Sequence, residues 1–405
     1  MVGLKDLKMR TIFVLLMIYM VLCKSVAEGD RSLSKKDDNL DLGLQLKLLN
    51  KPAVKSLYTK YGDIYDCVDI KKQPAFDHPL LKNHTIQMKP SSFPTGLIDE
   101  ELLESIPSKT EIKSIRCPPQ TVLIRRTQKE DIVRAKSQVR RYPRNAHRLK
   151  AKPGYHYATF QVEISDLKYY GAKVSLSLDQ PKVSSTNQFS EAVLWVENGP
   201  IDQINSIQVG WTVNPKLFGD NRTRIFSYWT ADGFHKTGCF NLLCPGFVQV
   251  SRVKTIGMAY ELVSVYGGPK YEDHFYVFKD PKSGNWWYTG YKNGRNEPVG
   301  YWPSSLFTSL RDFANTISSG GEVYNPTNEH SFQMGNGHFP MGNTLLASSA
   351  RRLQYVDQKS ILGDVHTSLL RFKVSSPKCY KAEFVKPNRV YWINSILFGG
   401  PGGAC

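Results

Sequence analysis

The sequence predicts an all-β fold whose main part is an antiparallel two-sheet β-sandwich. Aromatic residues make up 12% of the chain, including 21 Tyr, and only 22% of residues are charged, which is typical of strand-rich proteins. Apolar and polar residues alternate with the period of a strand, as at 173–178, where Val174, Leu176 and Leu178 would share one face. Gly, Pro, Asn and Asp separate many such short runs, a pattern that favours sandwiches and barrels.

The expected strands lie in the C-terminal part of the chain. Besides 173–178, they are the runs 192–196, 206–213, 224–230, 248–253, 274–278, 286–291 and 369–374. Turn-forming residues stand between them at 198–200, 214–215, 267–269 and 292–294. Residues 303–313 are the one stretch here with a helical pattern. We therefore expect residues 153–405 to form the sandwich domain.

The N-terminus has the pattern of a cleavable signal peptide over residues 1–27. Lys5, Lys8 and Arg10 form a positive start, residues 12–22 are uniformly apolar, and small residues at 25–27 supply a cleavage site. This apolar run is too short to span a bilayer, which takes about 20 residues, and no later stretch approaches that length. The sequence predicts a secreted protein without a membrane anchor, with the cell wall or the vacuole as possible destinations.

Residues 28–133 are expected to form a smaller α+β pro-segment. Leu repeats at 40–49 fit a short amphipathic helix, and residues 122–124 fit a strand. A basic linker, residues 134–152, follows with eight Lys or Arg and no acidic residue. Such a run is typical of a solvated linker, and Arg140-Arg141 within it is a candidate processing site.

The formal net charge of +17 raises the question of a nucleic-acid partner. The basic linker contributes much of this charge, and no nucleic-acid recognition motif accompanies it. Lys and Arg in the sandwich domain are scattered along the chain, as on an ordinary surface. We expect no nucleic-acid partner.

Six Cys remain once the signal peptide, with Cys23, is removed. An even number in an oxidising compartment predicts three disulfides, for which fifteen pairings exist. Proximity in the sequence favours Cys67–Cys117, Cys239–Cys244 and Cys379–Cys405. Zinc is the alternative, but no CxxC pair or His cluster is present, so we expect no metal and no other cofactor. Sequons at Asn83 and Asn221 are candidate glycosylation sites.

Common catalytic signatures are absent from the sequence. It has no GxSxG elbow, HExxH, P-loop or Asp-Thr/Ser-Gly motif, and Asp232 is followed directly by Gly233 without the hydroxyl residue. The six Cys are assigned to disulfides. Carboxylates, amides and aromatic residues remain for any chemistry.

Several motifs, in order along the chain, resemble the plant neprosin family. They are IQVGW at 207–211, FGD at 218–220, YWTADG at 228–233, TGCFNLLCPGFVQ at 237–249, WW at 286–287, GYWP at 300–303, GGEVYN at 320–325 and GGPGG at 399–403. Upstream, CP at 117–118 and IRRT at 124–127 are similar to the family's activation-peptide domain. The resemblance covers nearly all of the chain after the signal peptide.

The resemblance implies a glutamic endopeptidase that acts on polypeptides and tends to cleave at Pro. It implies secretion as an inactive zymogen, whose pro-domain is bound to the catalytic domain and is lost in acid. The implied fold is a lectin-like jelly roll with the active site in a concave groove. Trp211, Tyr228 and Trp229 are candidate groove residues, although aromatic residues of a sandwich usually lie in its core.

The resemblance implies a catalytic pair of two Glu, which fall on Glu322 and on the position of Gln208. Two close carboxylates can share one proton, whereas Gln does not titrate, so this pair is no two-carboxylate site. Gln208 can still orient the water and donate an N–H to the oxyanion while Glu322 acts as base and then as acid. Fungal glutamic peptidases of similar shape use such a Gln/Glu pair.

Two other functions stay open from the sequence. If the pair is inactive, the protein is an extracellular binding module for a peptide or a cell-wall glycan. A glycan-active enzyme needs two carboxylates across a groove, for which Glu197, Asp232, Glu261 and Glu297 are the loosely placed candidates. Fold alone does not decide between these functions.

Overall fold

The computed structural model describes residues 41–96, 116–139, 153–162, 167–292, 295–326, 329–385 and 392–405. Residues up to 48 and residues from 49 onward belong to separate compact units. Residues 41–49 are helical, as the Leu repeats predict. The expected signal peptide and the Arg140-Arg141 site lie outside the described residues. In the described ranges, no helix combines the length and apolar character needed to cross a bilayer.

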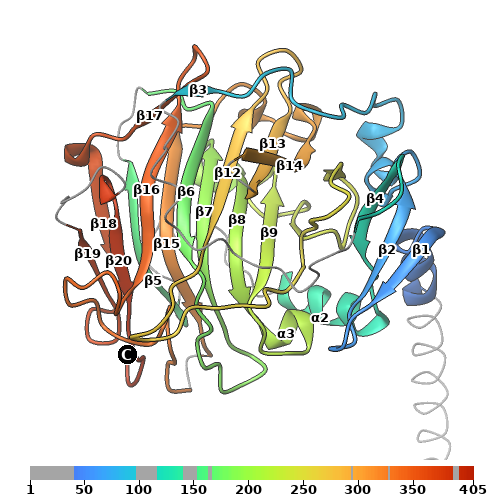
Figure 1. Ribbon diagram of the computed structural model, residues 1–405. Helices are drawn as coiled ribbons and strands as arrows, with labels where there is room; N and C mark the ends of the chain where they lie inside the picture. The colour runs from blue at the N-terminus through green and yellow to red at the C-terminus, as the bar shows by residue number, and fades with distance from the viewer. Residues whose placement is uncertain are drawn as a thin grey trace, which may run out of the picture. The chain divides into compact units, whose positions relative to one another are not determined.

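The larger unit is built on two antiparallel sheets, which Figure 1 shows face to face. One sheet, within the described residues, has seven strands in the order β10, β9, β8, β7, β15, β5, β18. Their bounds are Cys239–Phe240, Arg224–Thr230, Asn205–Val213, Phe189–Asn198, Thr316–Tyr324, Tyr155–Val162 and Leu370–Val374. The predicted all-β sandwich is confirmed.

The second sheet has ten strands among the described residues, with β11, β14, β13, β12, β6, β16, β17 and β3 in sequence across it. Their bounds are Val248–Gln249, Arg295–Trp302, Trp286–Lys292, Glu272–Lys279, Gly171–Ser177, Ser348–Val356, Ile361–Asp364 and Thr95–Gly96. Strand β20 (Ile396–Gly399) also pairs with β16, and β19 (Lys381–Phe384) pairs with β20. The short pairing of β17 with β3 is parallel.

The core between the two sheets explains the alternation seen in the sequence. Val174 and Leu176 on β6 and Val209 and Trp211 on β8 belong to one buried apolar cluster. The indole N–H of Trp211 donates to the carbonyl of Ser177 at 2.7 Å, which satisfies the polar end of this large side chain. Burial of these side chains is the main stabilising term of the sandwich.

The central strands of the seven-stranded sheet are buried on both faces. Every residue of β7, β8 and β9 is buried, so these strands show little simple alternation in the sequence. A second apolar cluster covers the face turned away from the core, and it includes Trp195, Phe226 and Tyr228. Ala135, which precedes the sandwich domain, belongs to the same cluster.

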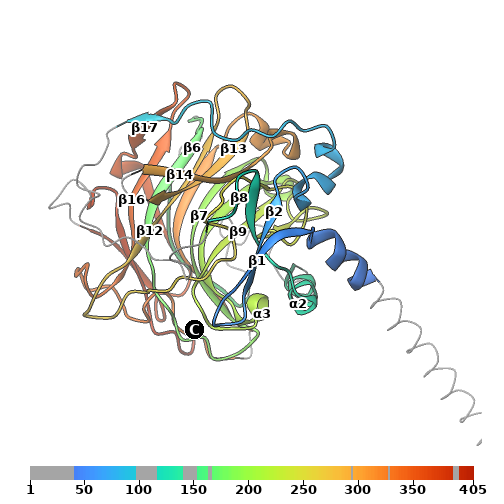
Figure 2. The same cartoon turned by 45° about the vertical axis from the view of Figure 1, so that its right-hand side comes forward.

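The pro-segment contributes a three-stranded sheet of β1 (Ala53–Tyr58), β2 (Ile64–Asp69) and β4 (Thr121–Arg125). Figures 1 and 2 show these strands beside the β8–β9 end of the sandwich. Backbone hydrogen bonds join them to it, from Cys117 N–H to the Arg252 carbonyl at 2.9 Å and from Leu123 N–H to the Ser251 carbonyl at 3.1 Å. The pro-segment from residue 49 therefore forms one compact unit with the sandwich.

The main differences from the sequence prediction concern helices. Helix α2 (Lys129–Val139) crosses the expected boundary at 134, so the first residues of the expected linker are helical. It lies next to α3 (Pro215–Phe218), as Figure 2 shows. The stretch 303–313 forms two short 3₁₀ turns, Ser304–Leu306 and Ser309–Arg311, instead of one helix. Leu306, Phe307 and Leu310 have helical spacing and are buried, but the Ser and Thr residues at 304, 305, 308 and 309 are weak helix formers, because their side chains compete for backbone hydrogen bonds.

All three expected disulfides are present, Cys67–Cys117, Cys239–Cys244 and Cys379–Cys405. The first lies wholly within the pro-segment, and the other two lie within the sandwich. The sequon residues Asn83 and Asn221 are both exposed, as glycan acceptors must be.

Candidate functional site

Gln208 and Glu322 lie on the same face of the seven-stranded sheet. Gln208 on β8 pairs with Trp195 on β7, and Trp195 pairs with Ser318 on β15. Glu322 follows Ser318 by four residues along β15, and side chains alternate with period two. The side chains of Gln208 and Glu322 therefore point to the same side of the sheet. Trp211, three residues after Gln208, points into the core. We call the side opposite the core, with Gln208 and Glu322, the site face.

Two glycines place β15 close to its surroundings just before Glu322. A Cβ at Gly320 would meet the Ala158 carbonyl oxygen of β5 at 2.5 Å, and a Cβ at Gly321 would meet Met334 and Phe398 at 2.7 Å. Gly320 also has a φ of +141°, which residues with a side chain rarely adopt. The Gly-Gly-Glu motif is thus a packing requirement that fixes the position of Glu322.

Glu322 is 3% exposed in the full chain. The hydroxyl of Tyr157 on β5 donates to its Oε1 at 3.2 Å. The pKa of Glu322 is raised to about 8, mainly by burial and with a smaller contribution from the charge of Glu197, while the Tyr157 hydrogen bond and the charge of Lys373 oppose this rise. A carboxyl group with this pKa is protonated in acid and neutral solution.

Lys373 on β18 is the cation that faces Glu322. It pairs with Thr159 of β5, which pairs with Gly320 of β15, so its side chain points to the site face. Its ammonium lies over the ring of Tyr157, 5.6 Å from the centroid. Burial lowers the pKa of Lys373 to about 8, while the charges of Glu197 and Glu322 raise it.

The raised pKa of Glu322 predicts a pH-dependent stability. The folded state favours the protonated carboxyl, so its contribution is fully present below 4.5, the ordinary value, and is lost as the pH rises towards about 8. Glu322→Gln should remove this loss and make the protein more stable than wild type at pH 8, by on the order of 3 kcal/mol, with little difference at pH 4.5. Denaturant unfolding of wild type and Glu322→Gln at pH 4.5 and pH 8 measures this difference in the free energy of unfolding. Replacement of the exposed Glu261 by Gln is the control, and an equal effect there would contradict the burial of charge as the cause.

Gln208 is 1% exposed, and its amide donates to the Ser206 hydroxyl at 3.3 Å. Its cross-strand neighbours are Trp195 and Tyr228, so apolar rings flank the amide. A Cβ at Gly210 would lie 2.0 Å from the Ala192 carbonyl oxygen, which explains the glycine two residues after Gln208. The amide offers two N–H donors and one acceptor without a titration.

The strand register separates Gln208 from Glu322 by two strands and by four residues along β15. Glu197 pairs with Thr316, and its row lies still further from Glu322 than the row of Gln208. The charge of Glu197 nevertheless raises the pKa of Glu322. Along the strand direction, the row of Gln208 therefore lies between the rows of Glu197 and Glu322.

The structure separates the three aromatic groove candidates. Tyr228 pairs with Gln208 and belongs to the apolar cluster on the site face. Trp211 and Trp229 belong to the core between the sheets instead, as is usual for such residues. Tyr157 and Lys373, which the sequence analysis did not single out, join Glu322, because only the strand register shows that they are its neighbours.

Of the carboxylates considered for glycan chemistry, only Glu197 shares the site face. Asp232 accepts hydrogen bonds from the backbone N–H groups of His235, Lys236 and Thr237, which holds a turn. Glu261 is exposed, and Glu297 lies on β14 of the other sheet. The structure does not bring these four carboxylates together.

The pro-segment covers one end of the site face. Ala135 of α2 packs into its apolar cluster, and the Arg134 guanidinium donates to the Leu217 carbonyl at 3.4 Å. Asp63 forms an ion pair with Arg224 at 2.8 Å. Arg224 lies in the same row of cross-strand partners as Glu322, because it pairs with Thr212, Thr212 pairs with Glu191, and Glu191 pairs with Glu322. Gln208 and Glu322 are both buried in the full chain.

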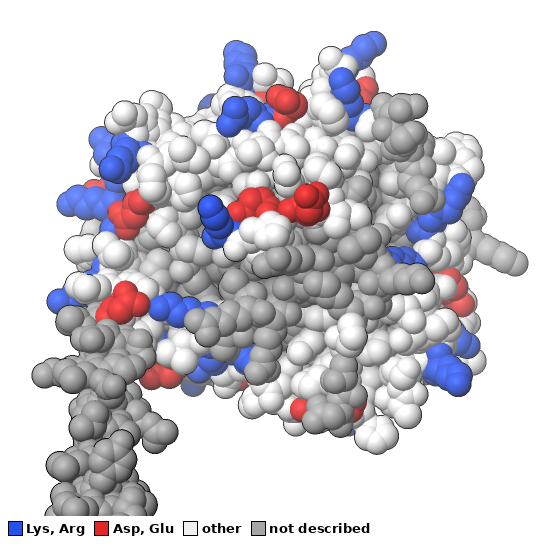
Figure 3. Space-filling model, turned by 180° about the vertical axis from the view of Figure 1, so that it is seen from behind, with Lys and Arg blue, Asp and Glu red and all other residues white. Residues whose placement is uncertain are grey.

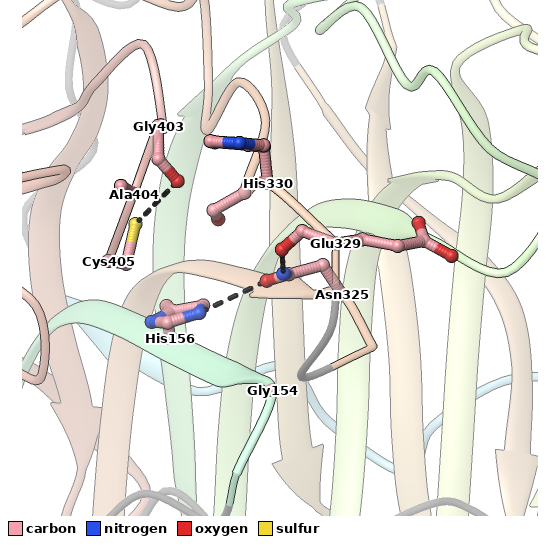
Figure 4. Close-up of a pocket in the computed structure, with 9 residues that line it drawn as sticks. Gly154, His156, Asn325, Glu329, His330, Gly403, Ala404 and Cys405 are labelled. Carbon is pink, nitrogen blue, oxygen red and sulfur yellow. Dashed lines mark hydrogen bonds between the residues drawn. The ribbon is translucent and has the colours of Figure 1, made fainter.

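A pocket of about 540 Å³ lies elsewhere, between His156, Asn325, Glu329, His330 and the C-terminal residues, as Figure 4 shows. His156 bonds to Asn325 at 3.1 Å. Because His156 directly precedes Tyr157 on β5, it points away from the site face. This pocket is therefore distinct from the Gln208 and Glu322 region.

On the face shown in Figure 3, Lys and Arg are scattered among Asp and Glu. The described residues of that face form no continuous basic surface of the kind that binds nucleic acid. Among the described residues, no three His, Cys, Asp or Glu are grouped to hold a metal ion.

Three solved structures resemble parts of this chain. Scytalido-glutamic peptidase with a peptide-based transition state analogue is 10% identical, with a TM-score of 0.35, over 62% of this chain and 98% of that chain. SCP-B, of the Eqolisin family of peptidases, in complex with the tripeptide Ala-Ile-His, is 9% identical with a TM-score of 0.32 over 62% and 98% of the chains. A β-porphyranase from the human gut bacterium Bacteroides plebeius is 8% identical, with a TM-score of 0.21, over 43% and 66%. At these values they give no correspondence between site residues.

The family models match most of the chain. The model of the neprosin activation peptide matches residues 56–168, and the neprosin model matches residues 186–401, which include Gln208 and Glu322. The activation-peptide match extends past the expected boundary at 133 and includes β5, the strand between β15 and the edge strand β18 of the seven-stranded sheet. With both matches in the expected order, the chain belongs to the neprosin family and carries the activation peptide of that family.

Proposed function

We propose that this protein is the secreted zymogen of a glutamic endopeptidase. Family membership, with the activation peptide, supports a glutamic-type peptidase made as a zymogen. The observation that carries the proposal is Glu322 itself, a buried carboxyl group with a raised pKa on the same sheet face as Gln208. Perturbed carboxyl groups of this kind mark catalytic acids and bases.

In the proposed mechanism, ionised Glu322 takes a proton from a water molecule. The water oxygen then bonds to the carbonyl carbon of the scissile peptide, and the carbonyl electron pair moves to its oxygen. An N–H of Gln208 donates to this oxyanion. Protonated Glu322 returns the proton to the leaving nitrogen as the C–N bond breaks, leaving a carboxylic acid and an amine.

The surroundings of Glu322 suit both the inactive full chain and the processed protein. In the full chain, burial keeps the Glu322 carboxyl protonated, so Glu322 cannot act as a base. Opening the site face to water removes much of this burial. The Tyr157 hydrogen bond and the positive charge of Lys373, which lower the pKa of Glu322, then favour the ionised base. Activation would therefore expose the site and ionise its base in one step.

Preference for Pro and activation in acid follow from the family resemblance and form part of the same proposal. The second candidate function is a binding module. It is favoured by Gln208, which does not titrate and stands where the family resemblance implies a Glu. The two functions differ in one result, because a binding module hydrolyses nothing.

The test is the release of new amino termini from an unstructured, Pro-rich protein. The full-length chain, processed by acid or by cleavage in the segment 140–152, should produce them at some pH between about 2.5 and 7, a range that brackets the ordinary carboxyl pKa values. No release at any pH in this range, from a chain shown to be cleaved, would support the binding module.

A further inference from the structure

A second buried carboxylate stands directly beside Glu322. Glu191 of β7 is the cross-strand partner of Glu322 of β15, and both are buried, with 1% and 3% exposure. Glu191 is also four residues before Trp195, the partner of Gln208, so it points to the site face. Directly opposed residues have Cβ atoms about 4.5–5.5 Å apart, which lets two Glu carboxyl groups meet.

Two carboxyl groups at this spacing cannot both be ionised at low cost, because like charges repel strongly where water is excluded. Such pairs hold one proton between them, as in aspartic peptidases. Tyr155 and Tyr157 border the pair; burial is the main cause that raises the pKa of each phenol, and the charges of Glu322 and Glu191 both add to it. The pair thus shares one electrostatic environment.

The other groups that face the pair are few among the described residues. Lys373 and Glu197 influence Glu322 from β18 and β7. On the other side, Glu191 pairs with Thr212 of β8, beyond which stands Arg224 of β9. Arg224 is held by Asp63 and Asp220. Glu191 is therefore the one carboxylate in strand register with Glu322.

On the basis of the proposed function, we propose that Glu191 is a positioning residue that shares one proton with Glu322. It thereby supplies the second carboxylate of the site, which Gln208 cannot supply. The ionised member of the pair lets Glu322 take the proton of the attacking water, and the proton already held by the pair stays available for the leaving nitrogen. Protons balance, since one enters from water and one leaves on the amine. Glu191 acts through Glu322 and does not touch the substrate.

The test compares pH profiles of kcat/KM for processed full-length wild type and Glu191→Gln. Wild type should show two limbs, one for each titration of the pair. In Glu191→Gln, the limb at higher pH should disappear, because it reports the loss of the shared proton, and the limb at lower pH should stay within about one pH unit, because the first deprotonation of the pair already takes place beside an uncharged neighbour. Thr212→Val is the matched control. It alters the other neighbour of Glu191 in the same row without a titratable group, and should keep both midpoints.

A purely structural role for Glu191 gives a different result. Glu191→Gln would then lose activity or stability at all pH values while both midpoints stay in place, and this outcome overturns the inference. If Glu191→Gln does not fold, Glu191→Asp keeps the charge but withdraws the carboxyl by one methylene, so the two midpoints should move closer together. Unchanged midpoints in this variant also overturn the inference.

A readout without activity separates this inference from the proposed function. Between pH 4.5 and 8, the loss of stability that Glu322 causes should be smaller in Glu191→Gln than in wild type, by unfolding measurements on the full chain. If wild type hydrolyses nothing but this difference is found, the proposed function fails and the shared proton stands. If wild type hydrolyses peptides and Glu191→Gln changes neither the profile nor the pH dependence of stability, only the inference about Glu191 fails.

Discussion

Glu322→Gln should abolish peptide hydrolysis by the processed protein at every pH. An amide cannot take the proton of the attacking water, and a general base contributes roughly 10²–10⁴ in rate. The change is nearly isosteric, and the Tyr157 hydroxyl can still donate to the amide oxygen, so the fold should persist. The measurement is the release of new amino termini by wild type and variant at equal concentrations of cleaved protein.

Gln208→Glu is the matched change at the other position of the pair. It restores the two Glu that the family resemblance implies, so activity should be kept or raised, and the pH profile should gain a further coupled titration. If Glu322→Gln and wild type cleave equally, the assignment of the base is wrong although the protein is an enzyme. If only Gln208→Glu cleaves, the natural protein is a disabled peptidase and the binding function is favoured.

The full-length chain should be inert at neutral pH, and activity should appear when the pro-segment leaves. Cleavage between about Arg134 and Lys152 should release it without reduction, because Cys67–Cys117 is internal to it and the other two described disulfides lie in the sandwich. Since β5 is paired on both sides, with β15 and with β18, the cut must fall before Tyr155 to leave the sheet intact.

Acid should promote this release through groups at the contact between pro-segment and sandwich. His84 bonds at 2.8 Å to the hydroxyl of Tyr301, and His78 lies near Trp229. Burial lowers the pKa of both His below 6.5. Their contribution to docking is therefore present above 6.5 and is lost as the pH falls through the lowered values.

Asp63 adds a second, more acidic step. Although burial opposes it, the charges and hydrogen bonds of Arg224 and Arg125 lower the pKa of Asp63 below 3.8. Its contribution is thus present above 3.8 and is lost as the pH falls further. We expect docking to weaken first below pH 6.5 and then again in strong acid.

His84→Gln tests the first step, because Gln can bond to Tyr301 but does not titrate. The variant should release its pro-segment at a lower pH than wild type, as followed by size-exclusion chromatography of cleaved protein across a pH series. His366→Gln, which changes an exposed His of the sandwich, should release at the wild-type pH. A cleaved His84→Gln with the wild-type midpoint would remove His84 from the acid response, and an uncleaved wild type that is fully active at neutral pH would contradict autoinhibition.

The sequence by itself determined the fold class, most strand positions and the disulfides. The alternation at 173–178 places Val174 and Leu176 in the core, because one buried face forces a period of two. Cys239 and Cys244 pair because five residues of chain bring them together. The motif around Glu322 could be recognised in the sequence, because Gly320 and Gly321 are required by the close packing at these two positions.

The tertiary structure decided which residues surround Glu322. Glu191, Tyr157 and Lys373 are its neighbours through strands that lie far apart in the chain, and no local pattern encodes which strands pair. Trp211 looked like a groove residue because it follows Gln208 closely, yet an odd spacing along a strand sends it to the opposite face. Helix α2 was not predicted, because its second half falls in the basic run that begins at residue 134. Its stability comes from packing against α3 and the site face rather than from its own sequence.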